Sequence, residues 1–256
     1  MSAFRIISSL AAALIAFATC AAAQIPAATD QSVLAMEPGG AVQPVMDRSI
    51  FAHVIFNELE GRWNGSDTEF RWEGQGWLGT DYDKLWIKSE GTLSKGALDD
   101  GQQQFLYSRA ITTYFDLQGG LRSDIDSRPT RNWAAFGIQG LAPYFFDLEA
   151  TGFVSGQGHL AAKLEASYDL LLTQRLILQP QVEVNVYSKS DPARLVGAGF
   201  SDIDTGLRLR YEFSRKFAPY IGVVYEGKFG QTANFARRAG EGTSDVRFAF
   251  GVRVWF

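Results

Sequence analysis

Cysteine, histidine and methionine are all scarce in this chain of 256 residues. Cys20 is its single cysteine, His53 and His159 are its two histidines, and it has three methionines. Because Cys20 lies within a predicted leader, the mature chain is expected to lack thiols, which excludes disulfides, zinc–thiolate sites and thiol catalysis. Basic residues do not outnumber acidic ones: the formal net charge is −4, which argues against nucleic acid as a partner.

Long hydrophobic runs are missing after the first twenty residues. At the N-terminus, Arg5 precedes an apolar stretch at residues 6–19, and three alanines at residues 21–23 precede Gln24. This pattern predicts a secretory signal peptide over residues 1–23, since the run is short for a membrane helix and ends in small residues. A lipoprotein anchor at Cys20 is the less favoured alternative, because the preceding residues fit such a site poorly.

Residues 24–50 show no hydrophobic period and are rich in Ala, Pro, Gly and Gln. Such a composition favours a flexible linker, which we expect in the periplasm. This linker holds Met36 and Met46, the only methionines that follow the predicted leader.

The last stretch of the chain, residues 246–256, alternates strictly between two faces. One face holds Val246, Phe248, Phe250, Val252, Val254 and Phe256, and the other holds Arg247, Ala249, Gly251, Arg253 and Trp255. A strand places alternate side chains on opposite faces. In a transmembrane β-barrel the apolar face meets lipid and the polar face meets the lumen. The spacing of Gly251, Val254 and Phe256 also resembles the C-terminal strand by which bacterial outer-membrane barrels are recognised for assembly.

About twelve segments show this alternation, and together they predict a barrel over residues 51–256. They are residues 51–62, 69–78, 84–93, 103–112, 115–125, 131–141, 145–154, 160–170, 176–187, 201–213, 220–228 and 246–256. Each is close to the length that a tilted strand needs to cross a bilayer. In the first segment, Glu58 and Glu60 are expected to face the lumen and Ile55 and Leu59 the lipid.

The connections between these segments alternate in length. Short turns are expected near residues 80–82, 113–114, 142–143, 172–174 and 214–216, and longer links at residues 61–67, 94–101, 126–130, 188–199 and 230–244. Short periplasmic turns and long outer loops are typical of bacterial barrels. The sequence therefore predicts an all-β fold, an antiparallel up-and-down transmembrane barrel with both ends periplasmic. A secreted β-sandwich would explain the alternation within strands but not that of the connections.

The predicted lumen face carries charges of both signs in strand after strand. Its acidic candidates are Glu58, Glu60, Asp147, Glu149, Glu165 and Glu226. The favoured interpretation is structural, with ion pairs filling a narrow barrel. The functional interpretation is an acidic path or binding site for cations, since carboxylates bind hard cations well.

Soft metal ligands are confined to the start of the mature chain. Met36, Met46 and His53 together could form a soft periplasmic metal site, although the spacing is unspecific and a lone histidine is more often a surface residue. Ser155 and His159 share one loop, but neither lies in a recognisable nucleophile context. We therefore do not expect an enzyme.

Long segments of the chain resemble the copper resistance protein B family of Gram-negative outer-membrane proteins. They are GWLGTDYDKLWIKSEG, TTYFDLQGGLR, RNWAAFGIQGLAPYFFDLEATGFVS, LEASYDLLLTQRLILQPQVEVNVYSK, DIDTGLRLRYEFSRKFAPYIGVVYEGKFG and AGEGTSDVRFAFGVRVWF. The resemblance covers residues 51–256. It implies an outer-membrane barrel acting in copper homeostasis, which binds copper or assists its export, in contact with outer-membrane lipid and with periplasmic copper-handling proteins.

One departure from the family concerns the N-terminal segment, which in many members is long and rich in Met and His. Here the corresponding linker offers only Met36 and Met46, with His53 nearby. The resemblance thus implies copper as the ligand without high-capacity sequestration. The alternatives are a general narrow channel or structural barrel without metal selectivity and, less favoured, a lipid-modifying barrel enzyme.

Overall fold

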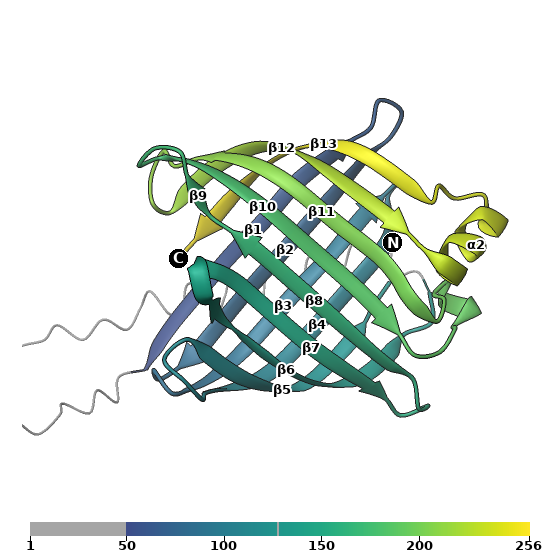
Figure 1. Cartoon of the computed structure of the whole chain (residues 1–256), viewed down its shortest axis with the longest axis horizontal. Helices are drawn as coiled ribbons and strands as arrows, with labels where there is room; N and C mark the ends of the chain where they lie inside the picture. Colours follow the sequence, from purple (N-terminus) through teal and green to yellow (C-terminus); the bar gives the residue numbers. More distant parts are fainter. Residues whose placement is uncertain (1–49, 127) are drawn as a thin grey trace, which may run out of the picture.

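The computed structural model of the chain describes residues 50–126 and 128–256. Their strands form one closed antiparallel barrel, in which each strand pairs with its neighbours in sequence and the last strand pairs with the first (Figure 1). The strands are β1 (Phe51–Trp63), β2 (Thr68–Gly79), β3 (Asp83–Ser94), β4 (Ala97–Ala110), β5 (Phe115–Asp124), β6 (Arg131–Ala142), β7 (Phe146–Ser155), β8 (Leu160–Tyr168), β9 (Leu170–Leu171), β10 (Leu176–Tyr187), β11 (Gly199–Tyr211), β12 (Phe217–Lys228) and β13 (Ser244–Trp255). The all-β barrel expected from the sequence is confirmed.

Strands β8 and β9 occupy one place in the barrel wall. Both pair with β10 in a single continuous register, which is interrupted only between Ser167 and Leu170. In that register Tyr168 lies opposite Pro180, which has no backbone N–H to donate. Counted this way, the barrel has 12 strands, the predicted number. The break within the eighth strand follows from Pro180.

One predicted loop is wrong. Residues 94–101 were expected to form a long link, but β3 and β4 extend through most of it and meet at the two-residue turn Lys95–Gly96. Lys95 (φ 51°) and Gly96 (φ 78°) both have left-handed backbones, as a tight hairpin turn requires. The acidic residues of this stretch belong to a projecting hairpin.

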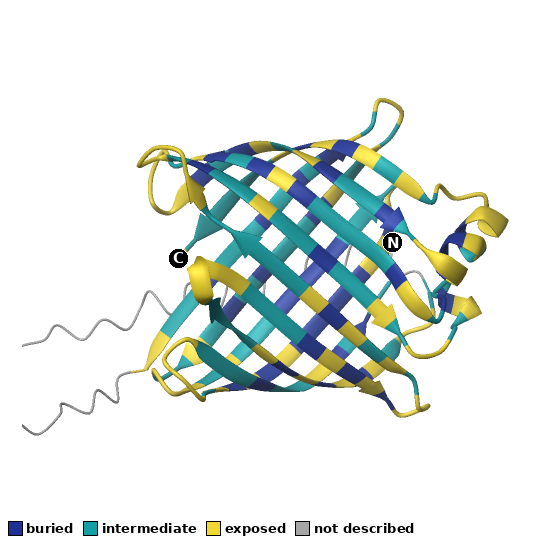
Figure 2. Ribbon diagram, in the orientation of Figure 1, coloured by how far each residue is buried: buried dark blue, intermediate teal, exposed yellow. Residues whose placement is uncertain are grey.

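The two faces of the wall differ in polarity. The outer face is a continuous apolar surface that includes Phe136 (65% exposed), Leu164 (47%) and Phe248 (60%). The inner face holds the most deeply buried side chains, many of them charged, such as Arg62 (1%) and Arg210 (1%) (Figure 2). This inversion of the soluble-protein pattern suits a barrel whose outside meets lipid.

A β-bulge in β1 corrects one predicted face. The pairing with β2 shifts between Phe56 and Glu58, so that Asn57 is an extra residue. Before the bulge His53 and Ile55 face the lumen, and after it Glu58 faces the lumen, as predicted. The expectation that Ile55 faces lipid is therefore wrong, because a one-residue insertion exchanges the faces of a strand.

The two ends of the barrel differ in their connections. The turn end carries Phe51, Trp255 and only short turns, whereas the loop end carries the three longest connections, residues 125–130, 188–198 and 229–243, beside shorter links such as Lys95–Gly96 (Figure 1). The longest of these contains the helix α2 (Gly230–Ala239), which the sequence analysis missed. Gly240 ends it in the left-handed conformation (φ 78°) and donates its N–H to the carbonyls of the last turn. Among the described residues, no helix has the length and apolarity that crossing a membrane would need.

Candidate functional site in the barrel lumen

A layer of buried ion pairs crosses the lumen between the two ends of the barrel. We call it the lumen plug. Its members are Glu58, Glu60, Arg62, Arg71, Glu90, Lys163, Glu183 and Arg208. They come from β1, β2, β3, β8, β10 and β11, so the plug connects strands that are far apart in the sequence.

Arg208 joins β11 to β1. Its Nε and Nη2 atoms donate to the two carboxylate oxygens of Glu60, each at 2.9 Å, in a bidentate pair. Its Nη2 also lies 2.7 Å from a carboxylate oxygen of Glu58. Arg62 contacts the same Glu60 at 2.7 Å through Nε. Such paired geometry is what makes burial of these charges tolerable.

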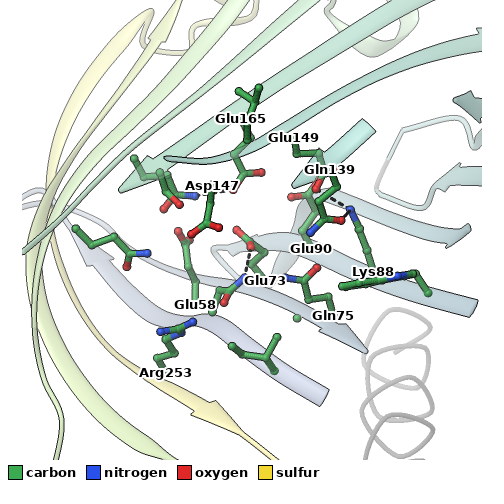
Figure 3. Close-up of a pocket in the computed structure, with 18 of the residues that line it drawn as sticks. Glu58, Glu73, Gln75, Lys88, Glu90, Gln139, Asp147, Glu149, Glu165 and Arg253 are labelled. Carbon is green, nitrogen blue, oxygen red and sulfur yellow. Dashed lines mark hydrogen bonds and ion pairs between the residues drawn. The ribbon is translucent and has the colours of Figure 1, made fainter. Parts of the chain in front are cut away.

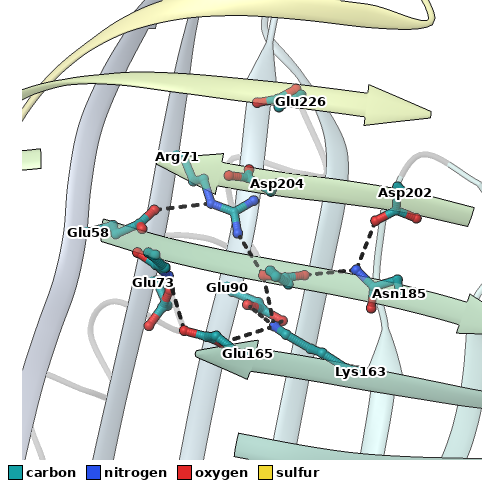
Figure 4. Close-up of polar contacts among 12 residues, drawn as sticks. Glu58, Arg71, Glu73, Glu90, Lys163, Glu165, Asn185, Asp202, Asp204 and Glu226 are labelled. Atoms are coloured by element: carbon teal, nitrogen blue, oxygen red, sulfur yellow. Dashed lines mark hydrogen bonds and ion pairs between the residues drawn. The ribbon is translucent and has the colours of Figure 1, made fainter. Parts of the chain in front are cut away.

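Arg71 and Lys163 continue the plug across the lumen (Figure 4). Arg71 lies 3.2 Å from Glu58 on one side and 3.5 Å from Glu183 on the other. The Lys163 ammonium donates to both carboxylate oxygens of Glu90 at 2.8 Å and lies 3.3 Å from Glu183. Every charged member of the plug thus has at least one partner of opposite sign.

Lys88 and Arg62 each make two further contacts across the lumen, beside the plug. Lys88 reaches Glu149 at 2.6 Å and Gln139 at 2.9 Å, joining β3 to β7 and β6. Arg62 extends beyond the plug to Glu226 at 2.6 Å and Asp204 at 2.7 Å. The middle of the lumen is therefore filled by side chains that are joined to one another by ion pairs and hydrogen bonds.

The plug separates two cavities. The turn-end cavity has a volume of about 380 Å³ and is lined by His53 and Arg253 as well as by plug residues such as Glu58 (Figure 3). The loop-end cavity, of about 830 Å³, is lined by plug residue Arg71 and by loop residues such as Glu241. Of the residues that the structure describes, none lines both cavities.

The predicted acidic candidates divide into paired and unpaired groups. Glu58 and Glu60 belong to the plug, and Glu149 and Glu226 are paired with Lys88 and Arg62. Glu165 lies 3.8 Å from Lys163 and accepts a hydrogen bond from Gln181. Asp147 lines the turn-end cavity, and no ion pair to it occurs within the described part of the chain. These contacts favour the structural interpretation for most of the set.

Sequence reasoning did not identify the cationic side of the plug as a unit. Arg71, Lys163 and Arg208 each stand at lumen-facing positions of clean alternating strands, so their inward direction could be predicted. Their partners could not, because long side chains reach across the lumen to strands far away in sequence. Among the described residues, no group of three or more His, Cys, Asp and Glu is arranged to hold a metal ion.

Of the three predicted soft ligands, the structure places one. His53 faces the lumen at the turn end, where its ring centroid lies 5.5 Å from that of Trp255 and 6.2 Å from that of Trp77. Met36 and Met46 lie outside the described residues. The sequence analysis placed Trp255 on the polar face of the last strand, but it assigned neither Trp77 nor Trp255 to a site with His53.

A closed antiparallel barrel with an apolar outside and a charged lumen defines a transmembrane β-barrel. The solved structure of the NanC porin shares this fold, with a TM-score of 0.52 and 13% identity over 79% of this chain and 98% of that one.

Comparison of sequences identifies the family. The model of the Copper resistance protein B precursor family matches residues 50–256. Copper resistance protein B of Escherichia coli is 44% identical over 212 residues, which cover 83% of this chain and 72% of that protein. A Copper resistance protein B homolog of Pseudomonas syringae pv. tomato is 40% identical over 232 residues, covering 91% and 79%. The chain belongs to the copper resistance protein B family and is a β-barrel of the bacterial outer membrane.

Proposed function

We propose that this protein binds copper(I) at the periplasmic face of the outer membrane and does not conduct ions through an open pore. The observation that carries the proposal is the lumen plug, which fills the barrel between two separate cavities. A narrow general channel needs a continuous aqueous path, and the plug opposes one. Membership of the copper resistance family supplies the ligand.

The orientation follows from the connections. Bacterial barrels carry their long loops on the outer side, so the end with the three longest connections is taken as the outside and the turn end as the periplasmic side. The linker over residues 24–50 enters β1 at that end, so Met36 and Met46 would share a compartment with His53. Thioethers and imidazole are the ligands that copper(I) prefers. A site of this kind has few ligands and suits transfer to or from periplasmic copper-handling proteins.

A non-enzymatic role agrees with the family and with the loop that was considered for catalysis. Ser155 and His159 are joined through their backbones, since the N–H of Ser155 donates to the carbonyl of His159 at 2.9 Å. Within the described part of the chain, no hydrogen bond joins the two side chains. A nucleophile activated by a neighbouring base would need such a contact.

The test is an anaerobic copper(I) titration of the folded mature protein in detergent against a chromogenic chelator. Met36→Leu together with Met46→Leu should weaken binding strongly, because Leu keeps the volume and removes the sulfur. His159→Ala, at the loop end, is the matched control and should bind as the unchanged protein does. Absence of copper(I) binding by the unchanged protein, or equal affinity in the double variant, would overturn the proposed site.

A further inference from the structure

Four aromatic side chains form an arc on the lumen face of the turn end. Trp255, His53, Trp77 and Trp86 come from the adjacent strands β13, β1, β2 and β3. Successive ring centroids lie 5.5, 6.2 and 6.4 Å apart. Apart from the outward-facing Trp63 and Trp72 and the loop-end Trp133, these are all the tryptophans of the chain. Half of them therefore surround the one histidine that faces the lumen at this end.

Register and the bulge place these rings together. His53 pairs directly with Trp77, and Trp77 pairs directly with Trp86, so the three share one face. Trp255 pairs with Ile55, two residues from His53 on the same face of β1. Without the bulge at Asn57, the alternation that turns Glu58 inward would turn His53 toward lipid. The bulge thus allows a histidine at the mouth and carboxylates in the plug to lie on one strand.

The π faces of this arc already attract cations. The Nζ atoms of Lys216, Lys84 and Lys88 lie 5.5, 5.7 and 5.6 Å from the ring centroids of Trp255, Trp77 and Trp86 respectively. Cations held within about 6 Å of an indole face are attracted by the ring quadrupole, and tryptophan is the strongest of the aromatic residues in this respect. The same rings can therefore stabilise a positive charge held between them.

We propose that His53, flanked by Trp77 and Trp255, is the point at which a soft monovalent cation, copper(I), enters the barrel from the periplasm. The imidazole supplies a nitrogen ligand and the two indoles supply cation–π attraction. This inference rests on the proposed function. It adds a role for His53, Trp77 and Trp255, which lie in a barrel wall that contains no methionine.

The surroundings favour a soft ion of single charge. His53 also lines the turn-end cavity, whose carboxylates include Asp147 and Glu73 and whose positive charges include Arg253 (Figure 3). A hard divalent cation would seek several oxygen ligands, and no arrangement of three such residues is present among the described residues. A soft cation can bind to an imidazole nitrogen and a polarisable aromatic ring without several oxygen ligands.

The first experiment uses silver(I), a redox-stable cation of the same charge and similar softness, with the full mature protein in detergent. We expect silver to quench tryptophan emission, and we expect the Kd from the quenching curve to equal the Kd of silver binding. Trp77→Phe and Trp255→Phe keep an aromatic ring but weaken the cation–π attraction, and each should raise the Kd about three- to thirtyfold. Trp133→Phe, in the loop-end part of the lumen, is the matched control and should leave the affinity for silver unchanged.

Two more variants test the histidine and the charge. His53→Gln should lose most of the quenching, because the ion is no longer held between the rings. Lys216→Gln should lower the Kd, because its ammonium repels the ion and competes for the Trp255 ring. Silver that binds without quenching, or with the same Kd in His53→Gln as in the unchanged protein, would overturn the inference. In that case copper(I) binding that still depends on Met36 and Met46 would leave the proposed function standing, whereas absence of any copper(I) binding would remove both.

Discussion

The phenyl ring of Phe250 lies over Gly61, its direct partner across the seam where β13 meets β1. A Cβ atom at position 61 would lie 2.7 Å from the tip of that ring. Three more pairs of this kind follow in neighbouring strands: Phe56 over Gly74, Trp72 over Gly91, and the Tyr220 hydroxyl close to Gly251. Aromatic rings that cover glycines across strands fix the register of a sheet. The seam that closes the barrel is therefore specified by shape.

Replacing Gly61 by Ala should destabilise the folded barrel by about 1–3 kcal/mol, because the new methyl group must displace the Phe250 ring. Gly119→Ala is the matched control on the same outer face, since its nearest neighbour there lies 3.9 Å away. The temperature at which the folded, SDS-resistant band converts to the unfolded band on electrophoresis measures the difference. Equal conversion temperatures for the two variants would show that the ring does not fix the seam.

Lys163 and Leu164 are neighbours on opposite faces of β8. Leu164→Arg should cost about 2–4 kcal/mol if the residue lies near the bilayer midplane. Lys163→Met should cost about 3–5 kcal/mol, because it leaves the carboxylates of Glu90 and Glu183 buried without this partner. Adding Glu90→Gln to Lys163→Met should recover part of that loss. Urea unfolding of these three variants and of Glu90→Gln alone in lipid vesicles measures this, and strictly additive effects of Lys163→Met and Glu90→Gln would contradict a shared ion pair.

The plug should block ion flow. We expect the unchanged protein to give no steady conductance in a planar bilayer, since paired side chains fill the lumen between the two cavities. Replacing both Lys163 and Glu183 by alanine eliminates one ion pair and leaves the net charge unchanged. This double variant should show a measurable conductance. The double change Lys228→Ala with Glu241→Ala, which deletes an exposed pair at the loop end, is the control and should stay closed. A steadily conducting unchanged protein would show that the plug is not a barrier.

The loop end should loosen in acid. Glu241 follows α2 and accepts a hydrogen bond from Lys228 at 2.7 Å, which lowers the pKa of its carboxyl group. Because the pKa of Glu241 is lower in the folded protein than in the unfolded one, the pair stabilises the loop at any pH above the ordinary pKa of a glutamate. This stabilisation is lost as the pH falls through the lowered pKa. The pair is partly exposed, so its contribution is about 0.2–1 kcal/mol.

Hydrogen exchange of the α2 amides, corrected for its intrinsic dependence on pH, measures this loosening. Protection should fall as the pH drops below the ordinary pKa range of a glutamate, and Lys228→Gln should remove most of that dependence. Protection that falls equally in the variant would assign the acid effect to other groups.

Period-two alternation was enough to predict the barrel, the number of strands and most of the faces. It failed at Ile55, because a bulge is a departure from the very period on which the prediction depends. It also failed at residues 94–101, where polar residues suggested a loop but two left-handed residues allow a tight hairpin. The helix α2 was missed because ten residues within a long connection show no strand period.

The candidate site was harder to predict than the fold. The inward direction of Glu58 or Arg208 follows from alternation, but their contact joins β1 to β11 across the lumen and leaves no local signal. The place of His53 among tryptophans depends on the same bulge. The predicted ligands Met36 and Met46 lie outside the described residues, so their part in the site stays a prediction.

The measurement that tests the account most directly is copper K-edge X-ray absorption of the mature protein loaded with copper(I). After the predicted leader, the chain contains no sulfur atoms except those of Met36 and Met46. We predict sulfur scattering together with the pattern of an imidazole ligand, and loss of the imidazole pattern in His53→Gln. Copper bound only through oxygen and nitrogen, without sulfur, would contradict the soft periplasmic site.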